Sequence, residues 1–152
     1  MAEYTVTAVW EREGGDFSYD AYSRDHTVSF GGDTTLCASA SPDYHGNPDC
    51  VNPEQTFIAS LSSCHMLTIL ALASKKGFVV RRYEDVSYGV MGRNETRKPA
   101  VVEVRLNPVV QFDPDNRPTQ QQFDTLNDRA HANCLISNSI ARCVKVIVSA
   151  QI

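Results

Sequence analysis

The sequence predicts an α+β fold, because its segments follow the order strands, helix, strands, helix, strand. Two observations carry this prediction. Segments with alternating apolar side chains flank a stretch over 56–73 in which His65 is the only side chain able to carry charge. A second, amphipathic helical pattern lies between the later strands. The 152 residues fit one domain, so we expect a single domain over residues 1–152.

The composition excludes several classes of protein. Hydrophobic residues make up 42% and charged residues 21%, which argues against disordered and coiled-coil proteins. The formal net charge of −4 at pH 7 provides no broad basic field for nucleic acid or anionic lipid, so we expect neither nucleic acid nor membrane as a partner. The first ten residues alternate like a strand and lack the pattern of a signal peptide, so we expect a cytoplasmic protein.

The first third of the chain predicts two strands and a long loop. Alternation over 4–12 and 17–30 predicts the strands, and the glycines at Gly14 and Gly15 predict a hairpin between them. From Gly31 to Asn52 the residues are those of turns, which predicts a surface loop. A loop of this length is uncommon in a domain unless it has a function or packs on a partner.

A long helix follows with a well-marked beginning. Asn52 suits the N-cap, Pro53 the first helical position, and Gln55 the return bond of a capping box. The helix runs over 56–73 and should end before Gly77. Because it is apolar nearly all round, we expect it to be buried on every side. A membrane span is the weaker alternative, since polar residues interrupt the apolar stretch.

The later elements follow from alternation and capping signals. The second helix should bury Phe123 and Leu126. The predicted elements are strands over 78–91, 101–112 and 143–150, a helix from 118 or 119 to about 132, and a short helical or irregular piece over 134–140.

The unusual feature of the composition is its five cysteines: Cys37, Cys50, Cys64, Cys134 and Cys143. An odd number without short spacings is not the pattern of a secreted disulfide framework. In a reducing compartment each is a packed small side chain, a metal ligand or a reactive thiol. We expect structural or incidental roles for Cys37, Cys50 and Cys143.

Cys64 is the strongest candidate for a functional thiol. The run from Ser62 to His65 interrupts an aliphatic helix where burial should be greatest, and buried polar groups need partners. Such inconsistency is typical of functional sites, although simple packing is the alternative for both Cys64 and Cys134. We expect His65 to be a buried structural histidine. A metal site stays open as a further alternative, with donors drawn from Cys37, His45 and Cys50, or from His131 with Cys134.

Three features together resemble the OsmC/Ohr family of thiol-dependent hydroperoxide reductases. They are the opening Asn52 to Gln55 with Cys64 ten residues after Glu54, the glycine-ended helix before two long strands, and the Cys-x-x-Ser-Asn unit beginning at Cys134. The resemblance implies an α+β fold with antiparallel sheets around a long buried central helix, and two chains intertwined as a homodimer.

The resemblance also implies an activity and its residues. Cys64 would be the peroxidatic thiol, Cys134 the resolving thiol, Glu54 the family's glutamate and Arg24 its thiolate-stabilising arginine. The implied enzyme is a peroxiredoxin-like reductase that converts organic hydroperoxides to alcohols in oxidative or osmotic stress defence. A dithiol, of the lipoyl type, would restore the thiols, with neither metal nor organic cofactor. The alternative is a non-catalytic OsmC-like protein that binds a thiol or a small ligand.

Helix geometry limits how these residues can meet. Glu54 and Cys64 lie ten residues apart, which is about 15 Å on one helix, so a shared site needs Glu54 from a second subunit or a bridging arginine. Cys64 is beyond the reach of the helix dipole, so its thiolate needs a cation such as Arg24. The plain alternatives are helix-end electrostatics for Glu54 and a solvated Arg24. Apolar walls would favour alkyl or lipid hydroperoxides; they are expected from Phe57, Leu61, Met66 and Leu67.

Overall fold

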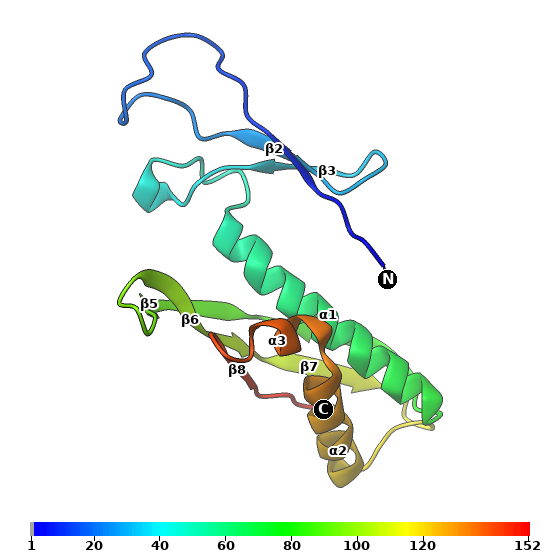
Figure 1. Ribbon diagram of the computed structural model, residues 1–152. Coiled ribbons are helices and arrows are strands. Elements are labelled where there is room, and N and C mark those ends of the chain that lie inside the picture. Colours follow the sequence, from blue (N-terminus) through cyan, green and yellow to red (C-terminus); the bar gives the residue numbers. More distant parts are fainter. Residues whose placement is uncertain (1) are drawn as a thin grey trace. The chain divides into compact units, whose positions relative to one another are not determined.

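The computed structural model describes residues 2–152, which form two compact units divided between Thr56 and Phe57. We call residues 2–56 the N-terminal unit and residues 57–152 the C-terminal unit. Figure 1 shows the elements of both along the chain. The expectation of one domain over the whole chain stays a prediction.

The N-terminal unit contains one antiparallel sheet in the order β1-β2-β3. Its strands are β1 (Thr7–Val9), β2 (His26–Ser29) and β3 (Thr35–Ala38). β1 and β2 pair antiparallel, as in the predicted hairpin. The predicted turn at Gly14 and Gly15 and the strand beginning at residue 17 are wrong, because residues 10–25 form a long connection. The aromatic rings at Trp10 and Phe17 contact each other within this connection, with ring centroids 5.7 Å apart, rather than alternating along a strand.

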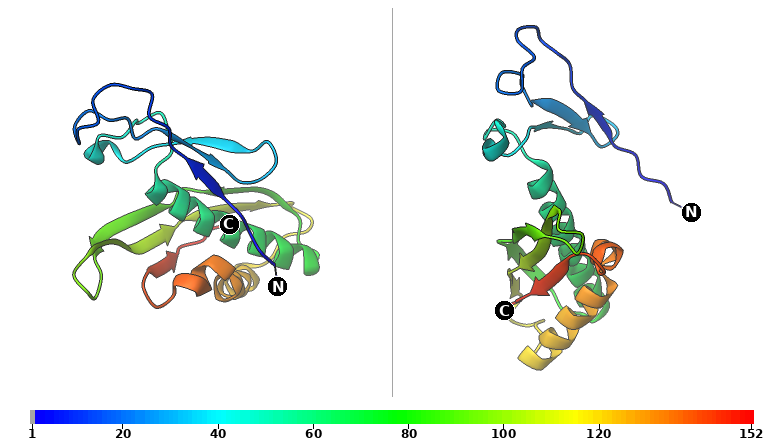
Figure 2. Two further views of the ribbon diagram at one scale, coloured as in Figure 1. Left: turned by 45° about the horizontal axis from the view of Figure 1, so that its top comes forward. Right: turned by 60° about the vertical axis from the view of Figure 1, so that its left-hand side comes forward.

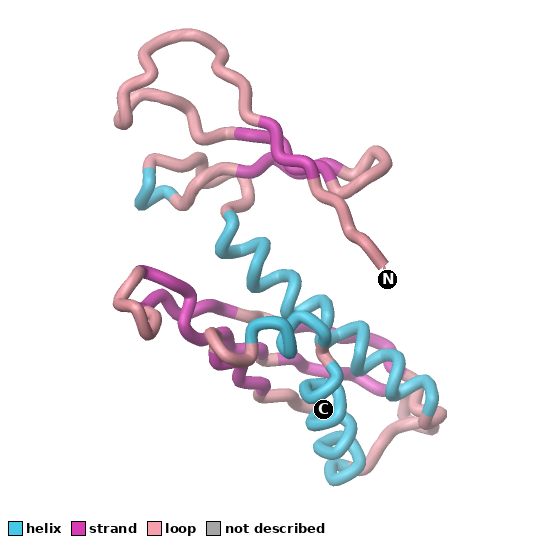
Figure 3. The backbone as a smooth tube through the Cα atoms, viewed as in Figure 1, coloured by secondary structure: helices cyan, strands magenta, loops and turns pink. Residues whose placement is uncertain are grey.

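The predicted loop from Gly31 to Asn52 is more ordered than expected. It holds β3 and a 3-10 helix, η1 (Pro42–Tyr44), and Ala38 forms a parallel bridge with Val51. A disulfide joins Cys37 to Cys50. The sequence pattern did not predict this pairing, which ties β3 to the segment just before α1. Figure 3 shows how much of the N-terminal unit remains loop.

The long helix begins and ends where the sequence predicts. α1 spans Pro53–Lys75. Asn52 Oδ1 accepts a hydrogen bond from the Gln55 amide at 2.8 Å, and Gln55 Oε1 accepts one from the Asn52 amide at 3.0 Å, which confirms the capping box. Gly77 then takes a positive φ of 77°, a conformation that suits a helix stop.

Burial of α1 differs from the expectation. Only one stripe of the helix is fully buried, with four residues spaced at four: Leu61, His65, Ile69 and Ala73. The prediction of burial on every side is wrong for the single chain, because the C-terminal unit covers one face, and Leu67 is 59% exposed. By length and composition alone α1 is able to cross a membrane, which is weak evidence, since core helices pass the same test.

The strands of the C-terminal unit form two small sheets. β4 (Val80–Asp85) pairs antiparallel with β7 (Pro108–Phe112), and β5 (Tyr88–Arg93) pairs antiparallel with β6 (Pro99–Leu106). β8 (Lys145–Val148) lies parallel to β6. Each of the two long strands predicted over 78–91 and 101–112 is therefore two strands.

The break has a local cause at Asp85. Asp85 Oδ1 accepts from the Asn107 amide at 2.7 Å, and Oδ2 accepts from the Ser87 hydroxyl at 2.6 Å. Asn107 Nδ2 donates to the Val86 carbonyl at 2.9 Å. Side chains thus form hydrogen bonds with backbone groups that would otherwise pair between continuous strands, so both predicted strands are interrupted at the same place.

Two helices complete the C-terminal unit, as Figure 2 shows from two sides. α2 (Gln120–Asn133) begins with a capping box from Thr119, and α3 (Leu135–Ile140) follows Cys134 directly. The prediction that Phe123 and Leu126 are buried is confirmed. They pack with Ile69 of α1 and Val110 of β7 in one core cluster. A second cluster joins α1 and β6 through Leu61, Val104 and Leu106.

Candidate functional site

The structure brings the two predicted reactive cysteines together. Cys64 lies on α1 and is half-buried, and Cys134 lies between α2 and α3 with 1% of its surface exposed. Their side chains are within hydrogen-bonding reach of each other. Neither is in a disulfide. Two reduced thiols from distant parts of the sequence therefore meet inside the C-terminal unit.

The surroundings of Cys134 keep its proton in place. Burial, and then the hydrogen bond with Cys64, raise the pKa of Cys134 to about 11. The backbone amides of Ser137 and Ile136 act in the opposite direction with smaller effect. Cys134 is consequently a neutral thiol at pH 7, able to donate its hydrogen to the Cys64 sulfur. This difference in protonation suits Cys64 as the nucleophile and Cys134 as the resolving thiol, which reacts second.

His65, the residue after Cys64, is fully buried, which confirms the expected buried histidine. Its Nδ1 and the Tyr83 hydroxyl are 3.1 Å apart, within hydrogen-bond distance. Burial, and then the charge of His131, lower the pKa of His65 to about 4. Burial, and then the charge of Asp85, raise the pKa of Tyr83. Both groups are therefore neutral at pH 7.

Three buried polar atoms beside this pair have no hydrogen-bond partner in the described chain: His65 Nε2, Asn127 Oδ1 and His131 Nδ1. Asn127 and His131 lie one turn apart on α2, and both influence the protonation of His65. His65 follows Cys64, and His131 precedes Cys134 by three residues. Polar residues of α1 and α2 thus meet close in sequence to each thiol.

Sequence reasoning missed Tyr83, Asp85 and Asn127. Asp85 Oδ2 accepts a hydrogen bond from Ser62 at 2.5 Å, which supplies the partner that a serine in an apolar helix requires. The available signal was an acidic residue inside the strand predicted over 78–91. No sequence spacing links Tyr83 or Asn127 to His65, because these contacts join separate elements.

Arg24 lies in the N-terminal unit among aromatic rings. Its guanidinium carbon is 3.8 Å from the ring centroid of Tyr22 and 5.1 Å from that of Tyr19, and its N–H groups donate to the backbone carbonyls of both residues. Arg24 lines a hollow of about 630 Å³ in this unit, together with Trp10, Phe17, Tyr22, His26, Ser39, Ala40 and Pro53. Within residues 2–152, no carboxylate forms an ion pair with Arg24.

Glu54 sits in the first turn of α1, and its Oε2 is buried without a hydrogen-bond partner in the described residues. The structure does not join Glu54 to Arg24. Both belong to the N-terminal unit, whereas Cys64 and Cys134 belong to the C-terminal unit. A site that uses all four residues therefore stays a prediction.

The metal alternative finds no set of donors. Among residues 2–152, no three His, Cys, Asp or Glu side chains are grouped so that they could hold a metal ion. Cys37 and Cys50 are bonded to each other. His131 and Cys134 lack a third ligand of these types.

Solved structures resemble the whole chain. An OsmC-like protein of unknown function from Vibrio cholerae is 37% identical, with a TM-score of 0.92 and 99% of each chain covered. An organic hydroperoxide resistance protein OsmC from Legionella pneumophila is 22% identical, with a TM-score of 0.72 and 100% of each chain covered. The organic hydroperoxide resistance protein OhrB of Bacillus subtilis is 17% identical, with a TM-score of 0.65, covering 99% of this chain and 98% of that one.

No curated protein matches the sequence. The family model described as OsmC-like protein matches residues 46–149, which include the capped start of α1, Cys64, Cys134 and β8. The α+β architecture, with antiparallel sheets and a long central helix, agrees with that match. On its sequence and its fold, the chain belongs to the OsmC-like protein family.

Proposed function

We propose that this protein is a thiol-dependent peroxidase that reduces organic hydroperoxides to alcohols at Cys64. The observation that carries the proposal is the contact between Cys64 and a buried, protonated Cys134, with both thiols reduced. Two of the similar structures are described as organic hydroperoxide resistance proteins, which supports the choice of oxidant.

The proposed cycle has three steps. The Cys64 thiolate attacks the O–O bond of ROOH, so that Cys64 becomes a sulfenic acid and RO⁻ leaves and is protonated to the alcohol. The Cys134 sulfur then attacks the sulfenic sulfur, forming a Cys64–Cys134 disulfide while its proton and the hydroxyl leave as water. A dithiol of the lipoyl type reduces this disulfide through a mixed disulfide and becomes a cyclic disulfide itself. The proposed setting is the cytoplasm, where such reductants are maintained.

The cycle needs the two thiols to differ in reactivity toward the hydroperoxide, and the surroundings of Cys134 support such a difference. Cys134 holds its proton because it is buried, so it does not compete for the hydroperoxide. His65 and Tyr83 bring no charge beside it at pH 7. Leu61 and Phe57 of α1 belong to an apolar cluster, consistent with an alkyl or lipid hydroperoxide rather than H₂O₂.

The proposal includes an intertwined homodimer with Arg24 and Glu54 completing the site. The uncovered face of α1, where Leu67 is 59% exposed, supports a second copy of the chain. The buried, unpartnered Oε2 of Glu54 requires a donor. Arg24 forms no ion pair with a carboxylate in the described residues. An arginine oriented by Glu54 would stabilise the Cys64 thiolate.

Turnover of cumene hydroperoxide with dihydrolipoamide tests the proposal. Cys64→Ser should abolish turnover, whereas Cys143→Ser, which alters an exposed free cysteine, should leave it at the wild-type rate. Wild-type activity in Cys64→Ser would contradict the mechanism. Peptide mapping after one equivalent of cumene hydroperoxide should find a Cys64–Cys134 disulfide.

A second candidate is a non-catalytic member of the family that binds a small ligand. The hollow beside Arg24, with its aromatic lining, favours it. Trp10 is the one tryptophan of the chain and lines this hollow, so its fluorescence reports binding there. Quenching of Trp10 by aromatic carboxylates, together with no turnover and no Cys64–Cys134 disulfide, would replace the peroxidase proposal with this one.

A further inference from the structure

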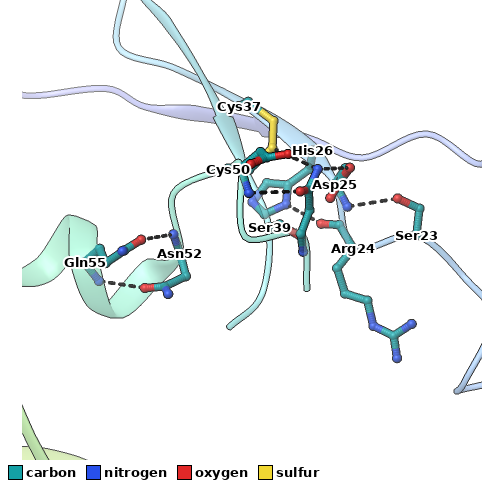
Figure 4. The surroundings of a disulfide bond; sticks show 11 residues. Ser23, Arg24, Asp25, His26, Cys37, Ser39, Cys50, Asn52 and Gln55 are labelled. Atoms are coloured by element: carbon teal, nitrogen blue, oxygen red, sulfur yellow. Dashed lines mark hydrogen bonds between the residues drawn. A yellow bond between two sulfur atoms is a disulfide. The ribbon is translucent and has the colours of Figure 1, made fainter. Parts of the chain in front are cut away.

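The Cys37–Cys50 disulfide lies in the N-terminal unit and takes no part in the proposed cycle. It joins β3 to the segment just before α1, with 5.1 Å between the two Cα atoms and 13 residues of sequence separation. Figure 4 shows it beside the segment that carries Asp25 and Arg24, and beside Asn52, which caps α1. We propose that Cys37 and Cys50 form a second redox site, which a small dithiol opens and which controls the Arg24 segment.

The two sulfurs are not equivalent toward a dithiol. Cys37 is exposed and Cys50 is half-buried, so a thiolate from solvent reaches the Cys37 sulfur and Cys50 leaves. Asn47 Nδ2 lies 3.5 Å from the Cys50 sulfur and donates to it. This hydrogen bond stabilises the thiolate that forms on Cys50, because a hydrogen bond to an ionised acceptor is stronger than one to a neutral acceptor.

The reaction balances without any further component. One thiolate of the dithiol attacks Cys37, forming a mixed disulfide and releasing Cys50 as a thiolate, which takes a proton from solvent. The second thiolate of the dithiol then displaces Cys37 and closes a cyclic disulfide. Two electrons and two protons pass from the dithiol to the protein, and reoxidation reverses this.

Asn47 connects the leaving sulfur to the arginine segment. The same Nδ2 group donates to Asp25 Oδ2 at 2.9 Å, and Asp25 directly follows Arg24. Reduction separates the Cys50 sulfur from Cys37 and frees the Cys50 side chain to rotate, so the contact that helps to hold Asn47 Nδ2 against Asp25 weakens. Backbone bonds between Val51 and both Cys37 and Ser39 persist, so the change centres on Asn47 and Asp25.

The compartment also favours a redox role. In the reducing cytoplasm proposed above, disulfides that persist are usually catalytic or redox-sensing rather than structural. This argument about the compartment rests on the proposed function, whereas the contacts of Asn47 do not. The test below therefore distinguishes failure of the Cys37–Cys50 redox site from failure of the proposed peroxidase function.

The first measurement titrates wild-type protein with dihydrolipoamide and lipoamide mixtures, then alkylates and maps all five cysteines. We expect Cys37 and Cys50 to become alkylated together, as a two-electron couple. An equimolar monothiol should reduce a much smaller fraction of the Cys37–Cys50 disulfide. Failure of Cys37 and Cys50 to label in a dihydrolipoamide excess that fully reduces a Cys64–Cys134 disulfide would overturn the proposal. A protein without peroxidase activity that still cycles Cys37 and Cys50 would remove the proposed function alone.

The second measurement follows Trp10, whose Nε1 donates to the Ser23 carbonyl at 2.8 Å, one residue before Arg24. Reduction should shift Trp10 emission, and the shift should reverse on reoxidation. Asn47→Ala removes the link, so it should lose most of the shift while Cys37 and Cys50 still label. Reduction of the wild type without any Trp10 shift would overturn control of the Arg24 segment. Cys143→Ser is the matched control and should behave as the wild type.

Discussion

Burial of His65 as a neutral side chain makes the stability of this protein depend on pH in a defined window. His65 binds a proton with its ordinary pKa of 6.5 in the unfolded chain and with a pKa of about 4 in the folded protein, chiefly because of burial. Between these values the unfolded chain holds more protons. Stability is therefore fully present above pH 6.5 and is lost as pH falls toward 4.

The size of the loss follows from the two pKa values. Each pKa unit of difference corresponds to about 1.4 kcal/mol, so complete titration of His65 costs about 3 kcal/mol of unfolding free energy. Between pH 7 and pH 5 the loss is about 2 kcal/mol by the same linkage relation. The charge of His131 is the second cause of the lowered pKa of His65. A smaller charge on His131 would therefore reduce the loss of unfolding free energy at low pH.

The assay is urea unfolding at pH 7 and pH 5, at one protein concentration, for the wild type and His65→Asn. Asparagine is uncharged and can still form a hydrogen bond with the Tyr83 hydroxyl. The stability cost of the substitution itself is therefore the same at pH 7 and pH 5 and cancels when the two pH values are compared. Carboxylates such as Asp113, whose pKa is lowered by its hydrogen bonds to the Asp115 amide and Arg81, titrate alike in both proteins. The same loss of unfolding free energy between pH 7 and pH 5 in both proteins would refute the conclusion that His65 is buried in its neutral form.

Three further outcomes follow from the structure. Cys134→Ser should still consume one equivalent of cumene hydroperoxide but leave a sulfenic acid on Cys64 that dimedone traps; an unmodified Cys64 would contradict the assigned order of thiols. Phe123→Ala should cost about 3–5 kcal/mol in urea unfolding, since Phe123 is fully buried, whereas Phe17→Ala, which alters an exposed ring, should cost far less. Thr119→Ala removes the α2 cap and should cost about 1 kcal/mol in the same assay, with an unchanged midpoint arguing against the capping box.

Local sequence chemistry determined the helices of this protein. The side chains of Asn52 and Gln55 satisfy the first free amides of α1, and Thr119 does the same for α2. These bonds join residues three apart, so they can be read directly from the sequence. Alternation likewise located the strands of the C-terminal half, and a Cys within an apolar helix marked Cys64 as unusual.

Contacts between distant residues were decided only by the tertiary structure. Asp85 ends β4 by binding Ser62, Ser87 and Asn107, so an alternation that continues in sequence stops in the fold. Cys37 and Cys50 pair because the bridge between Ala38 and Val51 brings their backbones together. No periodic pattern encodes either arrangement, since each depends on where a second element packs.

The thiols show the same division most clearly. The sequence by itself identified Cys64 and, through resemblance, Cys134, and it predicted a buried His65. Only the packing of α1 against α2 and α3 decided that the two thiols touch, that Cys134 keeps its proton, and that Tyr83 and Asn127 face His65. The physical reason is that protonation depends on burial and on neighbouring charges, and these arise only when separate helices pack together.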